Sequence, residues 1–147
     1  MVELRTITKD NFEDVISLNV SEHQKAFVSS TAHSLAQAYI YRDTAFPFAI
    51  YADNTVIGFI MLGYYEEKKQ YTLWKFMIDK NYQNQGYGKI ALKKGIEYLT
   101  DTLGAEEIYV GVSSENVVAK QLYSSVGFKA TGVFESNTEE MRYVCQR

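Results

Sequence analysis

Short hydrophobic runs and alternating apolar and polar residues recur along most of the chain, a pattern typical of strands that bury one face. Turn-forming residues such as Asp53-Asn54 and a charged stretch at residues 66–69 separate successive runs, which favours antiparallel hairpins. The predicted strands cover residues 2–8, 46–52, 55–63, 71–79, 107–112, 128–134 and 141–145.

Four other segments repeat apolar residues every three or four positions, which predicts helices with one buried face. Asp10-Asn11-Phe12-Glu13 has the form of a capping box, so Asp10 is expected to begin the first helix. The predicted helices cover residues 10–20, 32–41, 89–100 and 116–126, and Gly127 follows the last of them. Their expected buried residues are Phe12, Val15, Ile16 and Val20 in the first, Leu92, Ile96, Leu99 and Leu103 in the third, and Ala119, Leu122, Tyr123 and Val126 in the fourth.

The order of these elements predicts the topology of the sheet. Three antiparallel strands lead up to residue 79, and the helix at 89–100 then separates two strands that are expected to pair in parallel through a right-handed crossover. We therefore expect an α/β (α+β) fold with a mixed but mostly antiparallel sheet of about seven strands, flanked by about four helices. No linker or repeat divides the 147 residues, so residues 1–147 are expected to form a single domain.

The composition narrows the class of protein further. A formal net charge of −3 gives no long-range attraction to nucleic acid or to an anionic membrane, so neither is an expected partner. No apolar run approaches the roughly 18 residues of a membrane helix, and the start of the chain lacks the layout of a signal peptide, so a cytoplasmic location is expected. Cys145 is the single cysteine, which leaves no pair for a disulfide and no cysteine cluster for a metal; no metal is expected.

The run Gln83-Asn84-Gln85-Gly86-Tyr87-Gly88-Lys89 joins a predicted strand to a predicted helix. Glycines let the backbone approach a ligand closely, and the first N–H groups of a helix have no intrahelical partner, so this run predicts a site for phosphate oxygens. Lys89, Lys93 and Lys94 lie near the positive end of the helix dipole, where a cation is disfavoured by about 0.3–1 kcal/mol. A bound anion would offset that cost, and Lys89 is the best placed of the three to contact it.

Two common nucleotide motifs fit this run less well. Gly86-x-Gly88-x-x-Ala91 matches the dinucleotide fingerprint, and Glu106 and Glu107 follow at about the required twenty residues. In that fold the acidic residue ends a strand, whereas these two precede one, and three antiparallel strands come before the glycines. The P-loop pattern also fails, because no Gly-Lys-Ser/Thr ends the run.

The run does match a more demanding pattern. Gln83, Gly86 and Gly88 fit Gln/Arg-x-x-Gly-x-Gly/Ala, the acyl-CoA signature of the GNAT family of N-acetyltransferases. Residues 116–128 resemble a second element of that family, Asn-x-x-Ala-x-x-x-Tyr-x-x-x-Gly-Phe. The resemblance implies the GNAT fold for the whole chain and an acetyl-CoA-dependent N-acetyltransferase activity.

The resemblance also implies roles for individual residues. The loop from Gln85 to Lys89 would hold the CoA pyrophosphate through backbone amides, and Met77 and Ile78 would pair with the pantetheine arm and polarise the thioester carbonyl. Tyr123 would be the catalytic residue that donates a proton to the departing thiolate. The implied cofactor-binding residues are Met77, Ile78, Gln83, Gln85, Gly86, Tyr87, Gly88, Lys89, Asn116 and Lys120.

The acceptor is the least constrained part of the reaction. Residues 20–28 and 74–83 resemble the bacterial spermine/spermidine acetyltransferases, which implies a polyamine acceptor and direct attack on the thioester. However, Trp74 or Lys75 stands where relatives can carry an acidic residue. A protein N-terminus, an amino acid or an aminoglycoside are the alternative acceptors, and a CoA-binding module without catalysis is the alternative from another class.

Two further expectations concern the amine side and the assembly. An alkylammonium with a reference pKa near ~10.4 must lose a proton before it attacks, so a base or a water chain is required. The candidate bases are Glu22, His23, His33, Glu66 and Glu67, and no motif selects among them. The residues of the closing hairpin that could form a homodimer contact are Phe128, Val133, Phe134 and Tyr143.

Overall fold

A computed structural model describes residues 1–25 and 30–145 of the chain. Its centre is a seven-stranded sheet in the order β1-β2-β3-β4-β5-β7-β6, in which every neighbouring pair is antiparallel except β4 and β5. The strands are β1 (Val2–Thr6), β2 (Ala45–Ala52), β3 (Thr55–Tyr65), β4 (Gln70–Ile78), β5 (Glu107–Ser113), β6 (Lys129–Glu135) and β7 (Thr138–Val144). The predicted mixed, mostly antiparallel sheet is confirmed.

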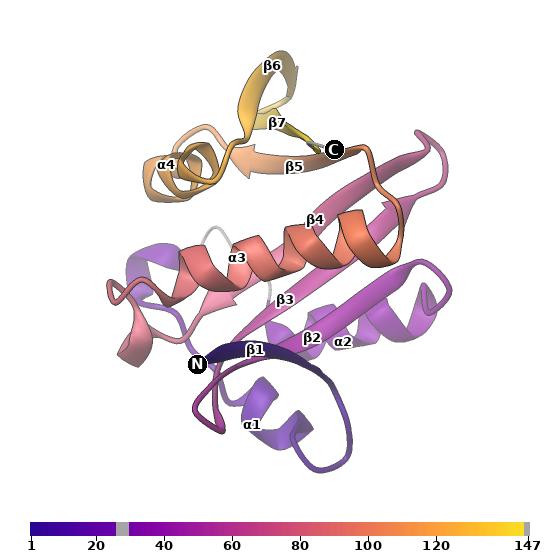
Figure 1. Cartoon of the computed structure of the whole chain (residues 1–147). Coiled ribbons are helices and arrows are strands. Elements are labelled where there is room, and N and C mark those ends of the chain that lie inside the picture. Colours follow the sequence, from indigo (N-terminus) through magenta and orange to yellow (C-terminus); the bar gives the residue numbers. More distant parts are fainter. Residues whose placement is uncertain (26–29, 146–147) are drawn as a thin grey trace.

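Four α-helices cover the two faces of this sheet (Figure 1). They are α1 (Phe12–Ile16), α2 (Thr31–Ile40), α3 (Tyr87–Glu97) and α4 (Val117–Ser125). Helix α3 lies across one face with α4 beside it, whereas α1 and α2 lie on the opposite face. Two short 3₁₀ helices, η1 (Glu22–Gln24) and η2 (Lys80–Tyr82), complete the connections that matter for the site. None of the helices described is long and apolar enough to cross a membrane.

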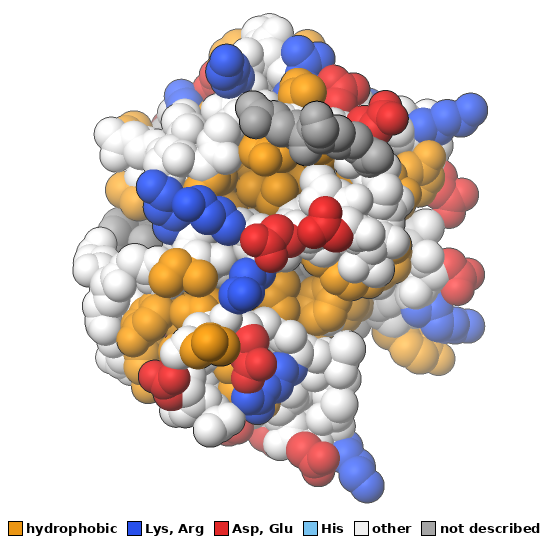
Figure 2. All heavy atoms as spheres, in the orientation of Figure 1, with side chains coloured by type: hydrophobic (Ala, Val, Ile, Leu, Met, Phe, Trp, Pro, Cys, Tyr) orange, Lys and Arg blue, Asp and Glu red, His pale blue; other side chains and the backbone are white. Residues whose placement is uncertain are grey.

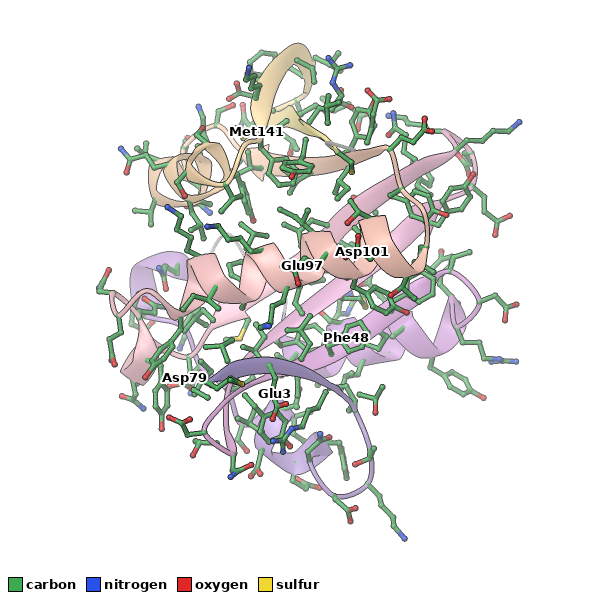
Figure 3. All side chains as sticks on the ribbon, in the orientation of Figure 1. Glu3, Phe48, Asp79, Glu97, Asp101 and Met141 are labelled. Atoms are coloured by element: carbon green, nitrogen blue, oxygen red, sulfur yellow. The ribbon has the colours of Figure 1, made fainter. Side chains whose placement is uncertain are left out.

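Each face of the sheet has its own hydrophobic core. Beneath α3 and α4 lie Leu92 and Leu99 of the predicted α3 stripe, together with Ile108, Phe128 and Met141 (Figure 3). The opposite core, beneath α1 and α2, contains Val15, Phe59 and Met77. The alternation of strand side chains between the two cores explains why the sequence pattern identified the strands correctly.

The start of α1 differs from the prediction. Asn11, not Asp10, precedes the helix, and its side chain makes no capping bond to the first turn. Instead Asn11 is buried: its Oδ1 accepts a hydrogen bond from the Thr8 N–H at 2.8 Å, and its Nδ2 donates to the Tyr51 hydroxyl at 3.2 Å. Because the helix is only five residues long, Phe12 and Ile16 are 40% and 38% exposed, and only Val15 and Val20 of the predicted face are buried.

Strands β4 and β5 separate soon after they begin. Their parallel pairing comprises Tyr71 with Ile108 and Thr72 with Tyr109. At the same point the register with β3 shifts by one, which makes Trp74 an extra residue on β4. A bulge of this kind bends a strand and increases its twist. The second half of β4 therefore leads away from β5 and carries the chain to the glycine loop.

Candidate active site

The glycine loop places a helix N-terminus at the end of β4. Gly86 has a φ of +85° and directly precedes α3, which begins at Tyr87, two residues earlier than predicted. The N–H groups of Tyr87, Gly88 and Lys89 therefore belong to the first turn, where no intrahelical carbonyl is within reach. A Cβ added to Gly86 would meet no atom within 4 Å. The loop thus presents free donors beside open space, as a phosphate site requires.

The charges on α3 run against its dipole. Lys89 and Lys93 are exposed near the positive N-terminal end. Glu97, the last residue of α3, and Asp101, in the π-helical turn η3 (Tyr98–Thr102) that continues it, are exposed at the other end (Figure 3). Figure 2 shows basic side chains gathered between α4 and the start of α3, and acidic side chains over its second half. Both placements cost stability in an isolated helix. A bound polyanion at the N-terminus would reverse the first of these penalties.

The strand register decides which residue of β4 can contact a ligand. The Asp79 N–H donates to the Ile57 carbonyl at 2.7 Å, so these two residues form a hydrogen-bonded pair of the β3–β4 ladder. Such pairs alternate along antiparallel strands, so the backbone N–H and C=O groups of Met77 also point toward β3. The backbone groups of Phe76 and Ile78 point to the opposite side, which β5 has left. The register therefore favours Ile78 over Met77 for pairing with a pantetheine arm.

Gly58, which the sequence did not single out, keeps this edge in place. It lies opposite Ile78 on β3, and a Cβ there would come within 2.5 Å of the Met77 carbonyl oxygen. Only glycine lets β3 approach β4 so closely at the point where the edge becomes open. An isolated glycine inside a predicted strand was the available signal.

Gln83 is held within the protein by its side-chain amide. Its Nε2 donates to the Ile78 carbonyl and to Oε1 of Gln24, both at 2.8 Å. An amide nitrogen has two hydrogens, so these two bonds use both of them. The family signature placed Gln83 at the cofactor site, and the structure adds that its nitrogen fixes the end of β4.

Asp79 links the end of β4 to the segment that follows α1 (Figure 3). The side chain is buried, and its two oxygens accept hydrogen bonds from the Asn19 and Asn81 N–H groups, each at 3.0 Å. Sequence reasoning missed this residue, because a carboxylate before a loop gives no indication of a partner 60 positions away.

Asp79→Ala should lower the free energy of unfolding by about 2–4 kcal/mol, since two N–H groups lose a charged acceptor. Chemical denaturation monitored by tryptophan fluorescence measures this. The matched control is Asp10→Ala: Asp10 is exposed and lies one residue before Asn11, the residue that precedes α1, so its loss should cost less than about 0.5 kcal/mol. A loss below about 0.5 kcal/mol in Asp79→Ala would contradict the role of Asp79, and a loss of about 2 kcal/mol in Asp10→Ala would contradict the absence of a capping box.

Helix α4 carries the second predicted element. Asn116 caps it, with the side-chain oxygen accepting from the Ala119 N–H at 3.3 Å. One turn on, the Lys120 ammonium lies 2.8 Å from Oε2 of Glu139 on β7. Lys120 is thus held by a carboxylate that the sequence did not associate with it. Its implied role as a cofactor-binding residue stays a prediction.

Tyr123 faces the core beneath α4. It is 8% exposed, and its ring packs against Phe128 with the centroids 5.8 Å apart. Burial raises the pKa of the phenol to about 12, because the phenolate would lose its hydration there. Among the residues described, none forms a hydrogen bond with the Tyr123 hydroxyl. Among the described residues, only Gln37 Oε1 is a fully buried side-chain polar atom without a partner, so the Tyr123 oxygen remains open to solvent or to a ligand atom.

The fold gives the candidate bases different positions relative to the proposed site. Glu66 and Glu67 lie in the turn before β4, at the opposite end of that strand from Ile78, roughly 25 Å away by strand rise. They are too far from Tyr123 and Ile78 to serve this site. Glu22 is 90% exposed beside Lys25, 3.0 Å away, whose hydrogen bond and charge lower the pKa of that carboxyl. It stays ionised and is a poor proton acceptor. His33 is exposed in the first turn of α2, and the side chain of His23 lies outside the described part of the chain.

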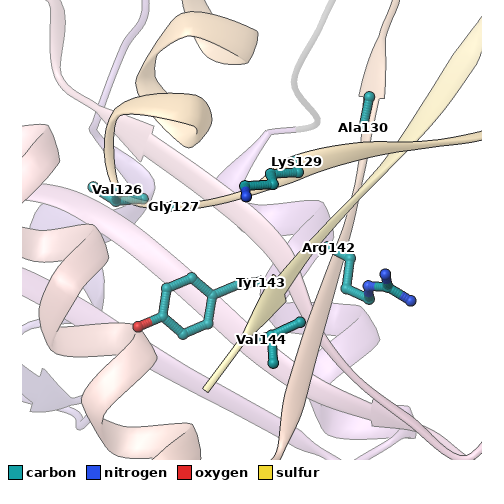
Figure 4. Close-up of a pocket in the computed structure, with 7 residues that line it drawn as sticks. All are labelled: Val126, Gly127, Lys129, Ala130, Arg142, Tyr143 and Val144. Carbon is teal, nitrogen blue, oxygen red and sulfur yellow. The ribbon is translucent and has the colours of Figure 1, made fainter. Parts of the chain in front are cut away.

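Two hollows in the surface lie away from these residues. One of about 420 Å³ is lined by Val126, Gly127, Lys129, Ala130, Arg142, Tyr143 and Val144 (Figure 4). The other, of about 360 Å³, lies behind Asp79 and is bordered by α1 and the β2–β3 turn. Neither is lined by a predicted cofactor residue. The described residues include no group of His, Cys, Asp or Glu side chains that could hold a metal ion.

Comparison with known proteins identifies a family and similar bacterial proteins. The family model of the acetyltransferase (GNAT) family matches residues 10–128. A probable spermine N(1)-acetyltransferase of Bacillus subtilis subsp. natto is 31% identical, over 95% of both chains. The spermine/spermidine N(1)-acetyltransferase of Bacillus subtilis strain 168 is 30% identical over the same shares.

Solved structures share the fold at lower identity. The spermidine N-acetyltransferase of Vibrio cholerae, solved with CoA and spermine, superposes with a TM-score of 0.77 at 18% identity, covering 97% of this chain and 95% of that one. The PaiA N-acetyltransferase of Thermoplasma acidophilum, solved with coenzyme A, gives 0.72 at 20% identity and 99% of each chain. These likenesses support the architecture of the sheet and helices.

Proposed function

The chain belongs to the acetyltransferase (GNAT) family and is an N-acetyltransferase, and we propose that it transfers the acetyl group of acetyl-CoA to a polyamine such as spermine or spermidine. The whole chain, residues 1–147, would act as one domain. The names of the two Bacillus relatives, which match over 95% of the chain, carry the proposal of a polyamine. The convergence of the open β4 edge, the α3 N-terminus and the buried Tyr123 supports the proposed site.

Acetyl-CoA would bind across the split between β4 and β5. The N–H groups from Gln85 to Lys89 would hold the pyrophosphate, and the backbone of Ile78 would pair with the pantetheine arm as an added strand does. Gly88 lies between β4 and α4, where an added Cβ would be 3.7–3.8 Å from Phe76, Ile78 and Leu122. These are ordinary van der Waals distances, so Gly88 brings the start of α3 close to both β4 and α4.

The reaction we propose is direct attack. The neutral amine nitrogen bonds to the thioester carbon, the carbon–sulfur bond breaks, the nitrogen loses a proton to solvent or a base, and the CoA sulfur leaves as a thiolate. The Ile78 N–H would stabilise the negative charge that develops on the carbonyl oxygen. No side chain of the protein becomes acetylated in this scheme.

Tyr123 would stabilise the departing sulfur. The pKa of the phenol is about 12 in the folded protein, whereas a thiol has a reference pKa near ~8.5. Full transfer of the phenolic proton to a free thiolate would therefore be uphill by about 5 kcal/mol. A hydrogen bond from the Tyr123 hydroxyl to the sulfur, strengthening as charge develops, stabilises the transition state without that cost.

The acceptor side must tolerate a polycation. The net charge of −3 favours approach of a polyamine over that of an acidic substrate. On β4, Lys75 is half-buried, and burial lowers the pKa of its ammonium. We also propose a contact between two copies through the closing hairpin. Val133 and Phe134 are 50% and 55% exposed there, whereas Phe128 is 2% exposed and is excluded from it.

A panel of amines tests the proposal. Release of free thiol from acetyl-CoA should be fastest with spermine or spermidine, and slower by at least about tenfold with an N-terminal peptide, an amino acid or an aminoglycoside, whose single or differently spaced charges fit less well. Tyr123→Phe, in which turnover should be strongly reduced, measures the background release of thiol. Turnover of another amine without turnover of either polyamine would remove the polyamine and leave the acetyltransferase.

A further inference from the structure

Two segments far apart in the sequence are hydrogen-bonded beside the proposed site. The Asn19 N–H donates to Asp79 Oδ2 at 3.0 Å, and the Lys80 N–H donates to the Asn19 carbonyl at 2.7 Å. Gln83 Nε2 donates to Gln24 Oε1 at 2.8 Å, across 59 positions. These bonds join residues 19–24, which lead out of α1, to residues 79–83, which lead into the glycine loop.

The bond from Gln83 to Gln24 differs from the other two because Gln83 also contacts the edge of β4 where CoA is proposed to bind. The same Gln83 nitrogen also holds the Ile78 carbonyl at 2.8 Å, on the edge of β4 that faces the split. Gln24 lies in η1, which follows α1, whose face of the sheet is opposite to that of α3 and α4. One amide group thus connects the cofactor edge of β4 with an element from the opposite face.

That opposite face is where an amine has to enter. In the proposed complex, the N-terminus of α3 binds the pyrophosphate and Tyr123 contacts the sulfur. Both groups lie on the α3–α4 face of the sheet. A nucleophile adds to a carbonyl carbon from above or below the plane of the carbonyl group, and a thioester that pairs with β4 as an added strand holds that plane near the plane of the sheet. The segment that contains η1 borders this second side, and it carries the ionised Glu22.

We propose that Gln24 is a positioning residue that couples the binding of acetyl-CoA to the binding of the amine, by fixing η1 to Gln83 and Ile78. The inference rests on the proposed function, since it assumes CoA at the glycine loop. CoA bound at that loop would hold Gln83 in place, and Gln83 would hold Gln24 through their hydrogen bond. The 3₁₀ helix η1 would then form a fixed border of the amine site. By linkage, the amine must strengthen CoA binding by the same factor.

Hydrogen exchange with CoA alone tests the first half without any turnover. In the wild type, CoA should slow exchange of amides at residues 84–89 and also at residues 19–25, which it does not contact. Gln24→Ala should keep the first effect and lose the second. Gln121→Ala removes an exposed glutamine of α4 and should behave as the wild type. Protection at 84–89 without protection at 19–25 in the wild type would overturn the coupling, and no protection at either would overturn the CoA site itself.

Calorimetry tests the second half. The Kd of CoA should be lower in the presence of saturating spermine by about 2- to 10-fold, the range expected for one hydrogen bond. Gln24→Ala should reduce this ratio to near 1 while changing the Kd of CoA alone by less than about 3-fold. Gln24→Glu keeps an acceptor oxygen for Gln83 and should restore the ratio. An unchanged ratio in Gln24→Ala, or a ratio of 1 in the wild type, would contradict the proposal.

Discussion

Tyr123→Phe is expected to lower kcat by about 10²-fold, because the departing sulfur loses its hydrogen-bond donor and general-acid assistance is commonly worth 10²–10⁴-fold. The KM for acetyl-CoA should change little, since the hydroxyl acts on charge that develops only in the transition state. Stability should be nearly unchanged, because none of the described residues forms a hydrogen bond with the hydroxyl and the packing of the ring against Phe128 is kept. Steady-state kinetics and thermal unfolding on the same preparations measure all three.

Tyr143→Phe is the matched control for that variant. The ring of Phe128 lies between Tyr123 and Tyr143, with centroid separations of 5.8 Å and 5.6 Å, so both tyrosines pack against one core side chain. Only the Tyr123 variant should lose activity. A kcat within twofold of the wild type in Tyr123→Phe would exclude the role in leaving-group stabilisation.

The pH dependence gives the same residue a second test. Because burial raises the pKa of Tyr123 to about 12, the phenol stays protonated, and able to donate, well above pH 9. The acceptor amine becomes a nucleophile only as its own proton is lost. The kcat/KM for the amine should therefore rise from pH 7 to about pH 9 with no falling limb from Tyr123. A loss of activity centred near the ordinary tyrosine pKa of ~10 would show that Tyr123 is less buried than described.

Gly86→Ala should weaken acetyl-CoA binding by about 10- to 100-fold. The residue has a φ of +85°, which disfavours any side chain by about 1–2 kcal/mol, and relaxation of that strain would turn the N–H groups of the loop away from the phosphates. Each charge-assisted hydrogen bond lost is worth about 1.5–3 kcal/mol, and about 1.4 kcal/mol corresponds to tenfold in affinity. Isothermal titration with CoA measures the change.

Gly132→Ala separates backbone strain from loss of the site. Gly132 on β6 also has a φ of +85°, and a Cβ there likewise meets nothing within 4 Å. The two variants should lose similar unfolding free energy, about 1–2 kcal/mol, yet only Gly86→Ala should lose affinity for CoA. If both variants bind CoA as the wild type does, the loop is not the pyrophosphate site.

The sequence predicted those features that depend on local pattern. The stripe of Leu92, Ile96 and Leu99 places α3 on the sheet, and this is confirmed. Alternation along the strands identified the sheet, and the helix between β4 and β5 required their parallel pairing. The candidate site was predicted by residue number because two glycine-containing motifs lie at fixed spacing, one at the start of α3 and one along α4, and these residue roles stay a prediction.

The features that escaped prediction depend on contacts between distant residues. The capping box at Asp10 failed because burial of Asn11 against Tyr51 fixes the start of α1 instead. The bulge at Trp74 follows from pairing with β3, which no local pattern records. The bonds of Gln83 and Asp79 to residues 19–24 likewise appear only when the chain has folded.

The most direct test of the proposed function is mass spectrometry of a single turnover, with the protein, acetyl-CoA and spermine in equal amounts. The account predicts a spermine that has gained one acetyl group, an equal amount of free CoA, and a protein whose mass is unchanged at every time point. Acetylated protein that forms before the product would contradict direct attack. Consumption of acetyl-CoA without acetylspermine would contradict the polyamine as acceptor.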